Sequence, residues 1–242
     1  MRAGYFRMVV ISVAATATLA ATTAHAEGLL RLRAGASQTS YDLAFDGGPY
    51  KGRSAKSTFA APGGALSYLA ENRFFVDLSG QSANGATHDL WTTPQPFSRS
   101  DFAVTAGYLS ESDLSVFGGY KSATSGLTAG AGAGFSKETF SSTGPFAGLG
   151  YSIAAGPGRL GANVAIAYML GEWKDDSGFK ATAYTLGASY SVTYTYMLAR
   201  HVGFQADARM QNYSYTFWDA TAGNYKVSEK VTALGLGLIV QF

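Results

Sequence analysis

The residues that would matter most if this chain were an enzyme are a histidine and a few acids. His88 is followed by Asp89 and Trp91, and Asp175-Asp176 is the only adjacent acidic pair in the sequence. A His/Asp pair can act as a general base, provided that the group it activates lies within hydrogen-bond reach. The neighbouring residues supply no further member of such a site. The required set of nucleophile, base and orienting group is mostly unfilled, so the sequence does not favour an enzyme.

Other chemical signals are weaker. His201 lies beside Arg200 in a short polar stretch, which is typical of a turn residue, and serine is too abundant to mark a nucleophile. Residues 126–135 are Gly-rich but lack the Lys and the following helix of a phosphate-binding loop. The chain has no cysteine, so it has neither a disulfide framework nor a cysteine-linked lipid anchor. Nothing indicates a metal or another cofactor.

The beginning of the chain predicts export. Arg2 and Arg7 give a basic start, residues 8–21 are mostly apolar and uncharged, and Ala24-His25-Ala26 fits the small-x-small cleavage rule. The apolar run is too short to span roughly 30 Å of hydrocarbon well. We therefore expect a cleaved signal peptide at residues 1–26 and one domain at residues 27–242.

The charge balance gives no indication of a nucleic-acid partner. The chain carries 18 Lys and Arg against 16 Asp and Glu. Arg2 and Arg7 belong to the predicted signal, so the remaining chain has 16 of each sign. No basic excess is left to attract phosphates.

The last residues of the chain alternate in polarity. Successive side chains of a strand point to opposite faces. In residues 233–242, one face is therefore wholly apolar, while the other is small or polar apart from Ile239. The apolar face consists of Leu234, Leu236, Leu238, Val240 and Phe242.

The same alternation recurs in residues 102–108, 114–120, 160–170 and 184–198. The longer apolar faces have about the length that a tilted strand needs to cross a bilayer, and several carry Tyr at or near an end, as interfacial girdles do. The alternate face is dominated by Gly, Ser and Thr, with too few Lys and Glu for a large water-exposed surface. We therefore expect the apolar face to meet lipid.

Tight connections and longer polar stretches divide the chain into strands. Four short connections lie near residues 70–72, 110–113, 155–158 and 198–200, and five longer stretches lie near 45–55, 83–98, 123–139, 171–178 and 219–226. Short periplasmic turns and long outer loops are expected of a transmembrane barrel. The sequence thus predicts an all-β protein, a closed antiparallel transmembrane β-barrel of ten strands. Twelve strands remain the alternative.

Charges on the inward face should line the lumen. If even-numbered residues face lipid, the inward charged residues are four of each sign: Arg31, Arg33, Asp77, Asp101, Lys121, Asp207, Arg209 and Glu229. Buried charges need partners, so this set should pair and largely close the narrow interior. Asp207 and Arg209 are two apart on one strand face, so each can reach a partner on a neighbouring strand as well as the other.

On these features the chain resembles small outer-membrane β-barrel proteins of Gram-negative bacteria. Residues 102–108 (FAVTAGY), 114–121 (LSVFGGYK) and 144–151 (GPFAGLGY) look similar to one such group whose role is unassigned. The resemblance implies an outer-membrane location, contact with lipid and lipopolysaccharide, and delivery by periplasmic chaperones. It also implies that the terminal Phe242, with its alternate apolar residues, is read by the barrel-assembly machinery.

His88-Asp89 also bears a faint resemblance to the His/Asp pair of omptin proteases, which use ten strands and hold water with a second acidic pair. Here the residues around Asp175-Asp176 do not match that second pair. We expect a non-enzymatic barrel with a structural or surface-recognition role, or a narrow conduit for small solutes. A porin-like open channel, and an omptin-like or lipid-modifying enzyme, remain alternatives.

Overall fold

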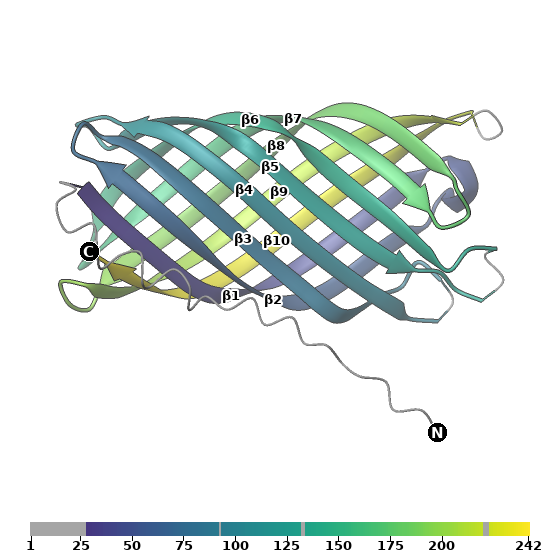
Figure 1. The fold of residues 1–242 in the computed structure, drawn as a ribbon, viewed down its shortest axis with the longest axis horizontal. Coiled ribbons are helices and arrows are strands. Elements are labelled where there is room, and N and C mark those ends of the chain that lie inside the picture. Colours follow the sequence, from purple (N-terminus) through teal and green to yellow (C-terminus); the bar gives the residue numbers. More distant parts are fainter. Residues whose placement is uncertain (1–27, 92, 132–133, 220–222) are drawn as a thin grey trace, which may run out of the picture.

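The chain forms a ten-stranded closed barrel. The computed structural model describes residues 28–91, 93–131, 134–219 and 223–242; the predicted signal peptide, residues 1–26, lies outside them. Within these residues every strand pairs antiparallel with its sequence neighbours, and β1 closes the barrel against β10 (Figure 1). The strands are β1 Gly28–Asp46, β2 Ser54–Ala70, β3 Phe74–His88, β4 Gln95–Leu109, β5 Leu114–Thr128, β6 Lys137–Ala155, β7 Gly158–Asp175, β8 Lys180–Met197, β9 Val202–Asp219 and β10 Gly223–Gln241.

Strand pairing closes the barrel completely in its periplasmic half. Toward the outer half the pairing is less complete, because β2 and β3 pair only where residues 63–69 face residues 75–81, and β8 and β9 only where residues 188–197 face residues 203–212. The first and last strands are in register from Arg31 opposite Gln241 to Asp46 opposite Lys226. Beyond that ladder, Phe242 N donates to Leu30 O at 2.9 Å and Leu30 N donates to Phe242 O at 3.1 Å. In lipid every backbone polar group must be satisfied within the protein. The prediction of a closed antiparallel barrel with ten strands is confirmed.

The two ends of the barrel differ less than expected. Turns 71–73, 110–113, 156–157 and 198–201 lie at the end where β1 begins and β10 finishes, which we take as the periplasmic end. At the outer end the connections are 47–53, 89–94, 129–136, 176–179 and 220–222, and the first contains a 3₁₀ turn at Gly48–Tyr50. The long outer loops of the expectation are therefore mostly strand, because the strands continue beyond the lipid-facing part.

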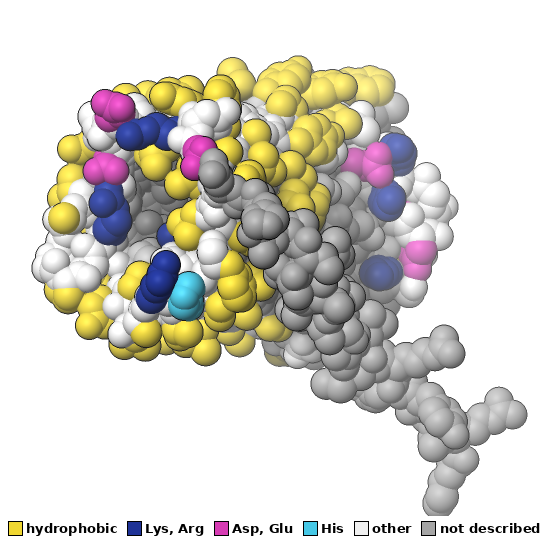
Figure 2. Space-filling view, turned by 60° about the vertical axis from the view of Figure 1, so that its left-hand side comes forward, with side chains coloured by type: hydrophobic (Ala, Val, Ile, Leu, Met, Phe, Trp, Pro, Cys, Tyr) yellow, Lys and Arg dark blue, Asp and Glu magenta, His cyan; other side chains and the backbone are white. Residues whose placement is uncertain are grey.

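A belt of apolar side chains surrounds the periplasmic half of the wall. Leu234, Leu236 and Leu238 face outward, each with 63 or 64% of its surface exposed. Phe74, Phe102, Ile166 and other large apolar residues of the neighbouring strands are also exposed. Figure 2, in which the periplasmic end comes forward, shows hydrophobic side chains over much of this wall. No helix among the described residues is long and apolar enough to cross a membrane.

Above the belt the two faces of the sheet exchange polarity. On β9 the inward residues change from Asp207 and Arg209 to the buried Tyr213, Tyr215 and Phe217. On β10 the outward residues change over the same height, from Leu234 to the exposed Lys230 and Lys226. The outer half stands in water, so burial of apolar surface drives its aromatic side chains inward.

One irregularity changes which residues face inward at the end of β3. The pairing of β3 with β4 slips between Asn84 and Ala86, and Gly85 has a φ of 81°. Such a β-bulge inserts one unpaired residue, and glycine takes positive φ without a steric penalty. Ala83 and His88 are both buried as a result, although one is at an odd and the other at an even position.

Candidate functional site

The periplasmic half of the barrel encloses a polar cavity, which we call the vestibule. Its volume is about 610 Å³, and its lining reaches from Leu29 and Leu109 near the periplasmic turns up to Lys121 and Tyr213. Figure 2 shows the periplasmic mouth hollowed, with Lys, Arg, Asp and Glu side chains around it. Seven charged residues line the vestibule: Arg31, Arg33, Asp77, Asp101, Lys121, Asp207 and Arg209.

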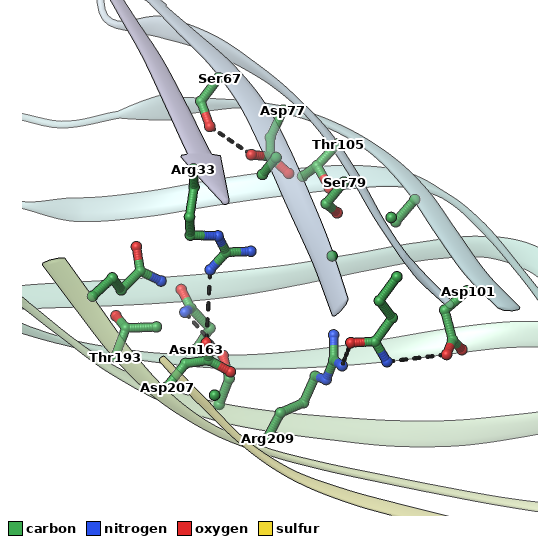
Figure 3. Close-up of a pocket in the computed structure, with 18 of the residues that line it drawn as sticks. Arg33, Ser67, Asp77, Ser79, Asp101, Thr105, Asn163, Thr193, Asp207 and Arg209 are labelled. Carbon is green, nitrogen blue, oxygen red and sulfur yellow. Dashed lines mark hydrogen bonds and ion pairs between the residues drawn. The ribbon is translucent and has the colours of Figure 1, made fainter. Parts of the chain in front are cut away.

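The side chains of the vestibule make few strong ion pairs with one another. Arg33 Nη1 lies 3.8 Å from Asp207 Oδ1, and both side chains are partly exposed, at 30% and 24%. The Asp77 carboxylate accepts a 2.6 Å hydrogen bond from Ser67 Oγ. Figure 3 shows the side chains of Arg33, Asp77 and Asp207 directed into the cavity from β1, β3 and β9. The charged residues thus line an open space and do not fill it, in contrast to the expectation.

Two arginines of the vestibule contact amides instead of carboxylates. Arg209 Nη2 donates to Gln81 Oε1 at 3.1 Å, and Arg31 Nη2 donates to Gln241 Oε1 at 3.3 Å. The Nε–H of each arginine is buried and has no hydrogen-bond partner among the described residues.

A layer of buried charges, which we call the charged layer, ends the vestibule. Arg99 lies at its centre: Nη1 contacts Glu229 Oε1 at 2.9 Å, and Nη2 contacts Asp101 Oδ1 at 2.9 Å. Arg99 Nε and Nη1 also donate to Asp101 Oδ2 and Ser125 Oγ. Lys121 Nζ donates to Gln211 Oε1 at 2.6 Å. Two cations and two carboxylates therefore balance here, with Arg99 saturated by its partners.

Sequence reasoning missed Arg99, although a signal was present. Arg99 is two residues before Asp101 on the same strand, so both side chains point to the same face. Its inward position follows from that spacing once Asp101 is assigned to the lumen.

Beyond the charged layer the lumen is filled by large apolar side chains, which we call the aromatic plug. It consists of Tyr41, Leu43, Phe45, Tyr50, Phe59, Leu90, Phe97, Leu127, Phe140, Met169, Trp173, Tyr213, Tyr215, Phe217, Tyr225 and Val227, all buried. Rings from different strands pack in contact; the centroids of Tyr41 and Phe97 are 5.2 Å apart, and those of Phe140 and Tyr215 are 5.3 Å apart. This spacing is typical of a packed aromatic core.

The charged layer and the aromatic plug are joined by cation–π contacts. Arg99 Cζ lies 4.8 Å from the centre of the Tyr41 ring, and Lys121 Nζ lies 5.1 Å from that of Tyr213.

At the outer end of the aromatic plug, Tyr50 donates a 2.6 Å hydrogen bond to the buried Glu138 carboxylate. Burial and this carboxylate raise the pKa of Tyr50 above its usual range, so its hydroxyl stays protonated and keeps donating.

The eight charged residues predicted to face inward fall into two sets. Arg31, Arg33, Asp77, Asp207 and Arg209 lie along the vestibule, whereas Asp101, Lys121 and Glu229 belong to the charged layer. Asp207 and Arg209 do not pair with each other: Asp207 is closest to Arg33, and Arg209 bonds to Gln81.

The histidine and the acid considered for catalysis are each held by a backbone group. His88 is 1% exposed, and its Nε2 lies 3.0 Å from the Thr128 carbonyl oxygen, whereas the Asp89 carboxylate accepts a hydrogen bond from Lys56 N. His88 was expected in a loop, and the bulge at Gly85 explains its inward position at the end of β3.

The acidic doublet, Asp175-Asp176, accepts hydrogen bonds from its own loop and from the neighbouring connection 129–136. Asp175 Oδ1 accepts hydrogen bonds from Ser177 N and Phe179 N. Asp176 accepts hydrogen bonds from Ser136, and these lower the pKa of its carboxyl.

The second histidine, His201, lies in the last periplasmic turn, where its Nδ1 is 2.8 Å from the Gln241 carbonyl oxygen. No group of three or more His, Asp or Glu residues suited to a metal ion occurs in the part of the chain that the structure describes.

The predicted assembly residues share the outward face of β10. Leu234, Leu236, Leu238 and Phe242 are exposed, Val240 is half-buried on the same face, and Ile239 is fully buried on the opposite face.

Comparisons with solved structures establish the fold. The outer membrane protease OmpT of Escherichia coli is similar with a TM-score of 0.65 and 12% identity, over 90% of this chain and 98% of that chain. The translocator domain of the autotransporter NalP from Neisseria meningitidis is similar with a TM-score of 0.51 and 11% identity, over 94% of this chain and 93% of that one.

No protein family and no curated protein matches the sequence. With its apolar belt, the chain has the fold of bacterial outer-membrane β-barrels, and its location is the bacterial outer membrane.

Proposed function

We propose that this chain is a non-enzymatic outer-membrane barrel that does not conduct solutes and that contacts partners through its outer strand ends. The observation that carries the proposal is the aromatic plug. A solute leaving the vestibule toward the outside meets the charged layer and then a packed set of rings. Protein interiors of this kind are packed as densely as organic crystals, so passage requires several rings to move together.

The positions of the histidines and acids support a role without catalysis. A general base must reach the proton that it removes, yet His88 is buried with its ring nitrogens near backbone groups. Asp89, Asp175 and Asp176 each accept hydrogen bonds from backbone N–H groups. These carboxylates stabilise strand ends and loops, and no base and water-holding pair is assembled from them.

The outer half offers a polar surface for partners. Above the belt the outward positions of β2 and β10 carry the exposed Lys56, Lys226 and Lys230, and Trp218 on β9 is 68% exposed. Lysines at this height suit the phosphate groups of lipopolysaccharide through charge attraction, and an exposed Trp suits a protein or glycan surface. Recognition at this surface, or a structural role, is therefore the proposed activity.

Single-channel recording in a planar lipid bilayer tests the proposal. We expect no large, steady currents from the unmodified protein. A variant with Tyr41→Ser, Phe97→Ser and Tyr215→Ser, checked for folding by its heat-modifiable mobility on gels, should conduct because the plug is opened. Large, steady currents from the unmodified barrel would overturn the proposal and favour the porin-like channel.

A narrow conduit is the second candidate, because the vestibule already extends from the periplasmic mouth to Lys121. Passage of a solute along this route requires only that the aromatic plug open transiently. Swelling of liposomes in small sugars measures this slow passage: uptake by the unmodified barrel that disappears when the plug is cross-linked would favour the conduit.

We also propose that Phe242 and the apolar face of β10 direct assembly. The Phe242 side chain is exposed at the end of the strand that closes the barrel. Changing Phe242 to Ser should reduce the heat-modifiable barrel in the outer membrane while export to the periplasm continues. An equal change at Trp218, an exposed aromatic at the other end, is the control. Unchanged assembly of the Phe242 variant would contradict the proposal.

A further inference from the structure

The vestibule contains cationic groups whose hydrogen-bonding capacity is not used by the protein. A guanidinium has five N–H donors in a fork that matches the oxygens of a carboxylate or phosphate. Arg99 shows the saturated case, with two carboxylates and a serine hydroxyl around it. Arg31 and Arg209 each make a single bond to an amide oxygen, and neither lies within 4.0 Å of a carboxylate among the described residues.

The acids of the vestibule do not compensate these arginines. Asp101 is held by Arg99, Asp77 is hydrogen-bonded to Ser67, and Asp207 lies opposite Arg33. The lining has four cationic and three carboxylate side chains, so it carries one net positive charge. Behind Asp101, Arg99 and Glu229 cancel each other in charge, so the cavity keeps its one net positive charge. Low-dielectric walls focus such a field and attract counter-ions.

The vestibule is accessible from one side. Its mouth is at the periplasmic end (Figure 2), and the charged layer and aromatic plug end it on the outer side. Figure 3 shows Arg209 directed into the cavity and bonded to the glutamine that in turn contacts Asp101. Gln81 thereby fixes one edge of the Arg209 guanidinium. The Nε–H has no partner among the described residues but is buried, so the donors open to a ligand are those of the Nη atoms.

We propose that the vestibule is a binding site for a small oxyanion, a carboxylate or a phosphate, that enters from the periplasm and is held by Arg209 and Arg31. The oxyanion forms charge-assisted hydrogen bonds with the unused donors of these guanidiniums. The hydroxyl and amide side chains of the wall, such as Asn163 and Ser189, are available for the neutral part of the molecule. A volume of about 610 Å³ is within the range of sites for small molecules.

Calorimetric titration of the purified barrel in a non-ionic detergent tests the site, with inorganic phosphate and succinate as separate probes. We expect saturable binding of at least one probe, weakened about tenfold by Arg209→Gln and by Arg31→Gln, since each removes a charged hydrogen-bond donor. Arg209→Lys keeps the charge and should lose less. The preference between the two probes tells whether a phosphate or a carboxylate suits the site better.

The matched control is Lys230→Gln, which removes an exposed cation on the outward face of β10. Binding should be unchanged in this variant. The proposal is overturned if neither probe binds saturably, if the arginine variants bind as tightly as the unmodified protein, or if Lys230→Gln weakens binding equally.

A second measurement leaves both arginines unchanged, so its result does not depend on whether the arginine variants fold. The chain has no cysteine, so Ser189→Cys places one thiol in the vestibule. Ser189 is opposite Gln211, two residues from Arg209 on the same face. A negatively charged thiol reagent should label it faster than a positively charged reagent of equal size, and phosphate or succinate should slow the labelling. Thr216→Cys, at an exposed position of β9, should show neither effect. Equal behaviour at the two sites would refute an anion site in the vestibule.

Discussion

The two halves of the lumen are built by the same ten strands and have opposite interiors. The vestibule is polar, open and lined by charges with few partners, whereas the aromatic plug is apolar, filled and closed. The surroundings of the wall explain the difference. Where the outside of the strand meets lipid, apolar residues face outward and polar residues are left for the lumen. Where the outside meets water, the strand buries its apolar residues inward as a soluble barrel does.

The charged layer between the halves should give the largest loss of stability when it is broken. Arg99→Gln leaves Asp101 and Glu229 buried without their cation, which costs about 3–5 kcal/mol of unfolding free energy. Urea unfolding in detergent micelles, followed by tryptophan fluorescence, measures it. The control is Arg33→Gln in the vestibule, where the longer contact is partly exposed. Equal losses from the two variants would show that the halves do not differ in how they hold charge.

A cavity in the aromatic plug should cost slightly less. Leu127 is fully buried, and Leu127→Ala should lower the unfolding free energy by about 3 kcal/mol, because the packed neighbours cannot collapse into the space. Ser189→Ala in the vestibule should change it by less than about 0.5 kcal/mol. The same unfolding measurement compares them. A cost at Ser189 as large as that at Leu127 would mean that the vestibule is packed.

A smaller loss than in the charged layer or the aromatic plug is expected at Asp207. From the sequence, its removal should leave Arg209 under-compensated at a cost of a few kcal/mol. In the structure Arg209 bonds to Gln81, and Asp207 has only the 3.8 Å contact with Arg33. Asp207→Asn should therefore cost less than about 1 kcal/mol, as partly exposed pairs do. A loss of several kcal/mol would restore the closer pairing that the sequence suggested.

The closed barrel was predictable because a period of two recurs on strand after strand. The outward face of residues 234–242 follows from the same pattern. Residue type alone does not reveal the aromatic plug, because Phe97 and Tyr215 are the same residue types as the lipid-facing Phe102 and Tyr190. Their odd positions do place them inward by the rule used for Asp101 and Arg209, but that rule was applied only to charged residues.

Two further features escaped sequence reasoning for local physical reasons. The outer strand ends resemble loops, because lysines such as Lys226 and Lys230 break the apolar pattern on the outward face while the inward face continues it. The burial of His88 depends on a single extra residue at Gly85, which reverses the faces for the rest of β3. A bulge of one residue leaves almost no trace in a pattern of alternating polarity.

The exchange of polarity above the belt also has a mechanical consequence. If the barrel rose out of the bilayer by two residues of a strand, about 7 Å, Leu234 and its neighbours would enter water and lose their apolar contacts. If it sank by the same distance, Lys230 and Lys56 would approach the hydrocarbon, where a cation is penalised increasingly with depth. Opposed restoring forces therefore act on the part of the wall that β1, β2 and β10 form. They hold these strands at a set height, so a partner bound at their outer ends is met at a constant distance from the lipid surface.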